Sequence, residues 1–125
     1  MSNWPIFTSG LLAGITFLIH LFAGGKDVAR PLLDSDIATE VKLTLYACWH
    51  LVSVALFLSS TALLASGSGL ILATGMVAFI SVLWLLFGAV FLVITLVVAR
   101  PGGLFRFPQW ILLVSGGGLG LWGLT

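Results

Sequence analysis

Four long runs of apolar residues, separated by short polar or glycine-rich segments, dominate the hydropathy pattern of this chain. A transmembrane helix needs about 20 predominantly apolar residues, with a range of about 17–25. The runs 6–23, 43–65, 70–99 and 108–124 meet or exceed that length, and none of them contains Asp, Glu, Lys or Arg. The pattern therefore predicts an all-α membrane protein, in which four transmembrane helices form one bundle within a single domain over residues 1–125.

The composition of the chain agrees with burial in lipid rather than in water. Of the 125 residues, 60% are hydrophobic and only 7% are charged, whereas a soluble domain carries about 25% charged residues. The net charge is +1, so the chain lacks the basic surface that nucleic-acid binding requires. A single cysteine, Cys48, excludes an internal disulfide. The expected partner is the lipid bilayer, and no nucleic-acid partner is expected.

The positions of the basic residues predict the orientation of the helices. All five lie beside or between the apolar runs, at Lys26, Arg30, Lys42, Arg100 and Arg106. Loops rich in Lys and Arg stay in the cytoplasm. We therefore expect the loops 24–42 and 100–107 to be cytoplasmic and both chain termini to lie outside. Glycine commonly ends a helix, so Gly24 and Gly25 are expected to end the first one.

Small residues on the first and fourth runs predict where the helices touch. In lipid, glycines spaced four apart allow two helix backbones to approach closely. Gly10 and Gly14 have this spacing in the first run, and Gly116 and Gly120 have it in the fourth. We expect these four glycines to mediate helix packing, with the first and fourth helices meeting through them.

Two histidines inside the apolar runs, His20 and His50, are the candidate functional residues. An ionisable side chain at membrane depth is costly, and it therefore indicates a functional role. Helical spacing places other polar side chains beside them, namely Thr16 on the first helix and Tyr46 and Ser53 on the second. These residues are expected to form a pocket for a ligand or a proton. The charged residues expected at its rim are Lys26, Arg30, Glu40 and Lys42.

The sequence pattern is consistent with three different functions. The first is an accessory or scaffold subunit, assembled with other membrane subunits or as a homo-oligomer, and the short loops favour it. The second is a small transporter or channel unit that uses the pocket of His20 and His50. The third is a redox subunit in which these histidines hold haem or a metal ion. We expect neither a cofactor nor catalysis, since the sequence contains no hydrolase, zinc-protease, phosphate-loop or dinucleotide motif.

The first half of the chain resembles small bacterial four-helix membrane proteins. The resemblance is carried by His20, by Gly24-Gly25, by Arg30-Pro31-Leu32-Leu33, and by Cys48-Trp49-His50 with Ser53. A histidine placed before a Gly-Gly pair at the end of the first helix is also similar to small haem-binding or copper-associated helical proteins. The resemblance implies a four-helix fold in a prokaryotic inner membrane, and it implies no particular activity.

Overall fold

The computed structural model describes residues 2–71, 73–98 and 108–125 of the chain, and these residues form helices and turns without a strand. The helices are α1 (Trp4–Ile19), the π-helix η1 (His20–Ala29), α2 (Arg30–Leu33), α3 (Thr39–Gly67), α4 (Thr74–Val98) and α5 (Gln109–Trp122). The prediction of an all-helical chain with four long helices is confirmed. Three segments, Trp4–Leu33, Thr39–Gly67 and Thr74–Val97, are long and apolar enough to cross a membrane, judged by length and composition.

The first helix continues well beyond its expected end at Gly24 and Gly25. Elements α1, η1 and α2 follow one another without interruption, and the Arg30 amide donates to the Gly25 carbonyl in the i→i+5 pattern of a π-helix. A proline inside an α-helix removes one hydrogen bond and clashes with the preceding turn, and π turns can accommodate the freed groups. Pro31 is the second residue after η1, so the wider turns allow the helix to run through it.

The connection between the first two long helices is consequently shorter than the expected loop 24–42. Only residues 34–38 lie between α2 and α3. The Ser35 hydroxyl donates to the Leu32 carbonyl over 2.6 Å, and the Lys42 ammonium donates to the Leu33 carbonyl over 2.9 Å. Both bonds satisfy carbonyls at the end of a helix, where intrahelical partners run out. The expected second loop, 100–107, lies outside the described residues.

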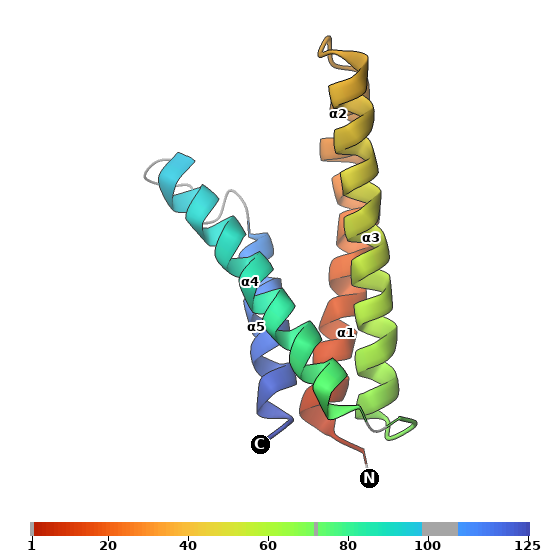
Figure 1. Ribbon diagram of the computed structural model, residues 1–125, viewed down its shortest axis with the longest axis vertical. Coiled ribbons are helices and arrows are strands. Elements are labelled where there is room, and N and C mark those ends of the chain that lie inside the picture. The colour runs from red at the N-terminus through yellow and green to blue at the C-terminus, as the bar shows by residue number, and fades with distance from the viewer. Residues whose placement is uncertain (1, 72, 99–107) are drawn as a thin grey trace.

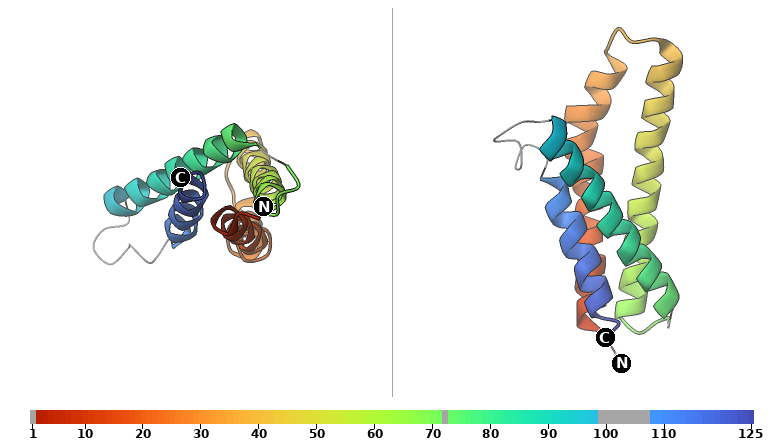
Figure 2. Two further views of the ribbon diagram at one scale, coloured as in Figure 1. Left: turned by 90° about the horizontal axis from the view of Figure 1, so that it is seen from below. Right: turned by 60° about the vertical axis from the view of Figure 1, so that its left-hand side comes forward.

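The long helices form two antiparallel pairs that meet at one end and diverge at the other (Figure 1). The α1–η1–α2 segment packs along α3, and α4 packs along α5. The two pairs meet mainly where α1 contacts α5, as the views in Figure 2 also show. Both chain ends lie at the joined end, whereas α2 lies at the far tip of the first pair. The arrangement is therefore an open one, with α4 and α3 in contact only to a small extent.

The glycine pair of α1 packs on α3, not on α5 as the sequence suggested. A Cβ atom added to Gly10 would lie 2.7 Å from the Leu64 amide nitrogen, and one added to Gly14 would lie 3.0 Å from the Ser60 hydroxyl. The Ser60 hydroxyl donates to the Gly10 carbonyl over 3.0 Å. The backbones of α1 and α3 are thus in direct contact, because no side chain separates them at Gly10.

The glycines of α5 pack mainly on α4. A Cβ atom on Gly116 would lie 3.1 Å from the Trp84 ring, and one on Gly120 would overlap Ser81. Helix α1 reaches the same region through Ser9, whose hydroxyl donates to the Gly116 carbonyl over 2.7 Å. The first and fourth long helices, α1 and α5, are therefore in contact as expected. At Gly116 the contact is a hydrogen bond from Ser9, and not the packing of two glycine motifs against each other.

Asn3 ties together three helix ends at the joined end of the molecule. Its backbone amide donates to the Gly67 carbonyl over 2.8 Å, at the end of α3. Its side-chain amide donates to the Gly123 carbonyl over 2.6 Å, and its side-chain oxygen accepts from the Ile6 amide at the start of α1. Beside it, the rings of Trp4 and Trp122 meet edge to face at 5.0 Å. The ends of α1, α3 and α5 are thereby fixed to one another.

Helix α5 is shorter than the expected span 108–124. Its 14 residues correspond to about 21 Å at 1.5 Å per residue, whereas the hydrocarbon core of a bilayer is about 30 Å thick. Its buried side is made by Leu113 and three glycines that face the neighbouring helices. Helix α5 is therefore held in place by its packing on α4 and α1.

Two adjacent glycines of α5 provide a matched test of this packing. A Cβ atom on Gly117 would lie 2.7 Å from the Ser81 carbonyl oxygen, whereas one on Gly118 has nothing within 4 Å. Gly117→Ala is expected to destabilise the fold by about 1–3 kcal/mol, since overpacking forces the backbones apart. Gly118→Ala is expected to be neutral, or to stabilise by about 0.5–1 kcal/mol through helix propensity.

Thermal unfolding of both variants in detergent, followed by circular dichroism, measures this difference. Equal melting temperatures for the two variants would contradict the described contact between α5 and α4.

Candidate functional site

His20 lies where α1 passes into η1, and its side chain bridges to the neighbouring helix. It is half-buried, and its Nε2 atom is 3.2 Å from the Trp49 carbonyl oxygen of α3. A carbonyl can only accept a hydrogen bond, so Nε2 carries the proton in this contact. The imidazole is thus already used as a link between two helices.

The Trp49 indole covers both His20 and the glycines that follow it. The His20 and Trp49 rings stack with centroids 4.6 Å apart and an angle of 21° between their planes. Cβ atoms on Gly24 and Gly25 would lie 3.7 Å and 3.9 Å from atoms of the same indole. The ring therefore packs along η1 beside the Gly-Gly pair, and a Cβ atom at either glycine would make ordinary van der Waals contact with it.

His50 lies on the exposed side of α3, and it faces aromatic rings of its own helix. Its ring meets Tyr46 at 4.5 Å and Trp49 at 4.9 Å, nearly perpendicular to both. Among the described residues, each of the two histidines stacks on or abuts Trp49 and not the other histidine. The structure thus brings His20, Tyr46 and His50 together around one indole, and the binding of a ligand or a proton by these residues stays a prediction.

The other residues expected at this site are accounted for by local hydrogen bonds. Thr16 and Ser53 are buried, and their hydroxyls donate to the carbonyls of Leu12 and Trp49, four residues earlier on their own helices. Such back-bonding satisfies a hydroxyl inside a helix without any ligand. At the expected rim, the side chains of Lys26, Arg30 and Glu40 are exposed. The Lys42 ammonium donates a hydrogen bond to the Leu33 carbonyl.

The atoms of the cluster that could bind a metal or haem are the ring nitrogens of His20 and His50. Within the part of the chain that the structure describes, no group of three or more His, Cys, Asp or Glu side chains converges. The His20 Nε2 atom faces the Trp49 carbonyl oxygen, so Nδ1 is the ring nitrogen of His20 that has a free lone pair for a metal or a haem iron. Cys48 is exposed on α3. Binding of haem or a metal ion by His20 and His50 therefore stays a prediction.

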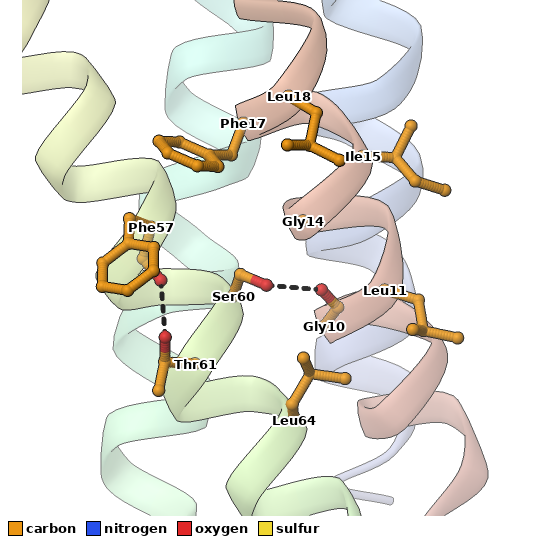
Figure 3. A pocket seen from close by; sticks show the side chains of 10 residues that line it. All are labelled: Gly10, Leu11, Gly14, Ile15, Phe17, Leu18, Phe57, Ser60, Thr61 and Leu64. Atoms are coloured by element: carbon orange, nitrogen blue, oxygen red, sulfur yellow. Dashed lines mark hydrogen bonds between the residues drawn. The ribbon is translucent and has the colours of Figure 1, made fainter. Parts of the chain in front are cut away.

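A second candidate site, which the sequence analysis missed, is a groove on the surface of the α1–α3 pair (Figure 3). Its volume is about 420 Å³. It is lined by Gly10, Leu11, Gly14, Ile15, Phe17 and Leu18 from α1, and by Phe57, Ser60, Thr61 and Leu64 from α3. The glycine spacing on α1 was the signal available in the sequence. It could not show that α3 would leave an open groove beside the contact.

Comparison with protein-family models, with curated proteins and with solved structures found no match to this chain. The functional argument therefore rests on the residues and geometry described above.

The two histidines are expected to differ in their contribution to stability. His20→Ala removes a hydrogen bond between helices, worth about 0.5–1.5 kcal/mol, and a ring contact of about 0.5–1.5 kcal/mol. His50→Ala removes ring contacts with Tyr46 and Trp49 of its own helix, from an exposed position. Thermal unfolding in detergent should therefore show a clear loss for His20→Ala and little change for His50→Ala. A larger loss for His50→Ala would show that His50 has an interhelical partner.

Proposed function

We propose that this chain is a small integral protein of a prokaryotic inner membrane, and that it serves as a non-catalytic accessory or scaffold subunit. It would contribute helices to a homo-oligomer or to a complex with other membrane subunits. The proposal has three supports, which are the apolar surface, the way polar groups are satisfied, and the open arrangement of the two helix pairs.

The large exposed apolar surface is the observation that carries the membrane assignment. In each of the three long helical segments, only 28% of the most apolar stretch is buried within the chain. Large apolar side chains are exposed along all of them, for example Leu51 (68%), Phe79 (68%) and Val97 (74%). A soluble monomer rarely exposes apolar patches on this scale. Hydrocarbon chains or apolar helices are the surroundings that suit such a surface.

Several hydroxyls between the helices are hydrogen-bonded within the protein, as a bilayer favours, although the buried hydroxyls of Ser66 and Ser81 have no hydrogen-bond partner among the described residues. Unsatisfied backbone groups cost several kcal/mol in hydrocarbon, and here almost all of the backbone is helical. The hydroxyls of Ser9 and Ser60 donate to carbonyls of neighbouring helices, and those of Thr61 and Thr95 donate to their own helices. Small residues and hydroxyls at helix contacts are typical of membrane proteins.

The charge distribution gives the proposed orientation. Lys26 and Arg30 lie toward the tip of the first helix pair, and the chain ends lie at the opposite end of the molecule. The 30-residue segment Trp4–Leu33 is about 45 Å long at 1.5 Å per residue, so it exceeds a hydrocarbon core of about 30 Å. The positive-inside rule then places the charged tip in the cytoplasm and the chain ends outside.

The divergence of the two helix pairs favours a subunit over an independent functional unit. Away from the joined end, α4 moves away from α1 and α3, so the chain does not close its own bundle (Figure 1). Additional helices would complete it. The alternative of a transporter or channel unit gains less support, because His50 is exposed and His20 serves as a link between helices. The redox alternative also gains less support, because no group of three or more His, Cys, Asp or Glu side chains converges among the described residues.

Cysteine labelling tests the membrane placement and the orientation. Cys48→Ser removes the only native thiol, and single cysteines are then introduced as Ser2→Cys or as Ser35→Cys at the charged tip. A membrane-impermeant maleimide is expected to label the first variant on intact cells and the second only after the membrane is opened. The opposite labelling pattern would reverse the orientation. Extraction of the protein by alkaline carbonate would contradict membrane insertion itself.

Native mass spectrometry of protein gently extracted from its own membrane tests the subunit role. We expect a mass that contains several copies of the chain or additional protein subunits. A bare monomer that retains its helical content would contradict the role. In a homo-oligomer whose copies meet through α3, the exposed Cys48 should also form disulfide-linked dimers on mild oxidation.

A further inference from the structure

The groove between α1 and α3 has walls made mostly of apolar side chains. Along α1 they are Leu11, Ile15, Phe17 and Leu18, and along α3 they are Phe57 and Leu64 (Figure 3). Gly14 and Ser60 are the small residues between these walls, and a Cβ atom on Gly14 would lie 3.0 Å from the Ser60 hydroxyl. A space of about 420 Å³ falls within the range of about 300–1,000 Å³ in which small-molecule sites occur.

The polar atoms in the groove are already hydrogen-bonded. The Ser60 hydroxyl donates to the Gly10 carbonyl over 3.0 Å, and the Thr61 hydroxyl donates to the Phe57 carbonyl over 2.9 Å (Figure 3). A polar ligand would have to compete with these bonds, and it would gain little from walls of leucine and phenylalanine. The chemistry of the groove therefore suits a hydrocarbon chain.

The position of the groove along the helices fits one leaflet of the bilayer. The exposed rings of Trp4 and Trp122 lie at the joined end, and tryptophans mark the interface between membrane and water. The groove residues Phe57 and Leu64 lie ten and three residues before Gly67, the last residue of α3. At 1.5 Å per residue, the groove lies about 5–15 Å below that interface, which is the depth of a lipid chain in that leaflet.

A thin chain fits the groove better than a second helix does. Close approach of a helix would use the glycine pair, but at Gly10 the space is already filled by Leu64 of α3. Leu11, Ile15 and Leu18 are each about half exposed at the edge of the groove. They would hold an incoming helix, which is about 10–12 Å across, away from the glycines at its floor.

We propose that the groove binds one acyl chain of a phospholipid from the leaflet at the joined end. The chain would lie along Gly14 and fill the gap that α1 and α3 leave open. This inference rests on the proposed membrane function, because it requires the outer face of the α1–α3 pair to contact lipid.

Photocrosslinking of the intact protein tests the proposal. The protein is reconstituted in vesicles of phosphatidylethanolamine and phosphatidylglycerol that contain a phospholipid with a diazirine at the middle of one acyl chain. After irradiation, the crosslinked residues are mapped by mass spectrometry. We expect several-fold more crosslinking at Leu11, Ile15 and Leu64 than at Phe79 and Val93, which are exposed on α4.

A substitution at the edge of the groove gives the matched comparison. Thr61→Phe places a ring over the groove, and it removes only a hydroxyl bonded to its own helix. It is expected to lower groove crosslinking to the level found on α4. Val93→Phe, at an exposed position of α4, is the control and should leave the groove signal unchanged. Circular dichroism confirms that both variants retain their helices.

The outcomes separate the groove from the membrane assignment. Equal crosslinking on all exposed helix faces would overturn the groove site and leave membrane insertion intact. Absence of crosslinking on every helix would overturn the proposed function as well. Unchanged groove crosslinking in Thr61→Phe would overturn the site. If a Thr61→Cys variant that lacks Cys48 forms disulfide-linked dimers, the occupant of the groove is a second copy of the chain and not a lipid chain.

Discussion

The fold depends on direct contact between helix backbones near the joined end of the molecule. Gly67 lies against the backbone of Phe7, and Gly117 lies against the carbonyl of Ser81, so a methyl group at either glycine would overlap the neighbouring helix. In lipid the hydrophobic effect provides little force between helices, and close packing with internal hydrogen bonds has to replace it. These close contacts determine which helices pair and over what part of their length the two pairs stay in contact.

The same contacts explain how several polar residues in this chain find hydrogen-bond partners. Once two backbones touch, a serine on one helix reaches a carbonyl on the other, as Ser9 and Ser60 do. His20 makes the same kind of link near the other end of the α1–α3 pair. His20, one of the two candidate functional residues, is thus one of several residues that form hydrogen bonds between helices. The open groove lies elsewhere, beside Gly10 and Gly14.

The sequence predicted the helices well, because an uncharged apolar run of this length has few other solutions. It predicted their partners poorly, since the spacing of Gly10 and Gly14 indicates a close contact without identifying the neighbour. It also failed at Gly24 and Gly25, because the π-helix η1 continues through both glycines, which lie beside the Trp49 ring of α3. Each failure concerns a contact with a distant residue, which local pattern does not encode.

The hydrogen bond from Asn3 to Gly123 joins positions that are 120 residues apart, and this has a consequence for biosynthesis. The α1–α3 pair can assemble as soon as α3 has left the ribosome, because its contacts lie within the first 67 residues. The bond to Gly123 and the contact between Trp4 and Trp122 become available only when the last helix has emerged. Until then Asn3 can form its bonds to Gly67 and Ile6, but its side-chain amide lacks the Gly123 carbonyl, so this last link of the fold forms only after residue 123 has been translated.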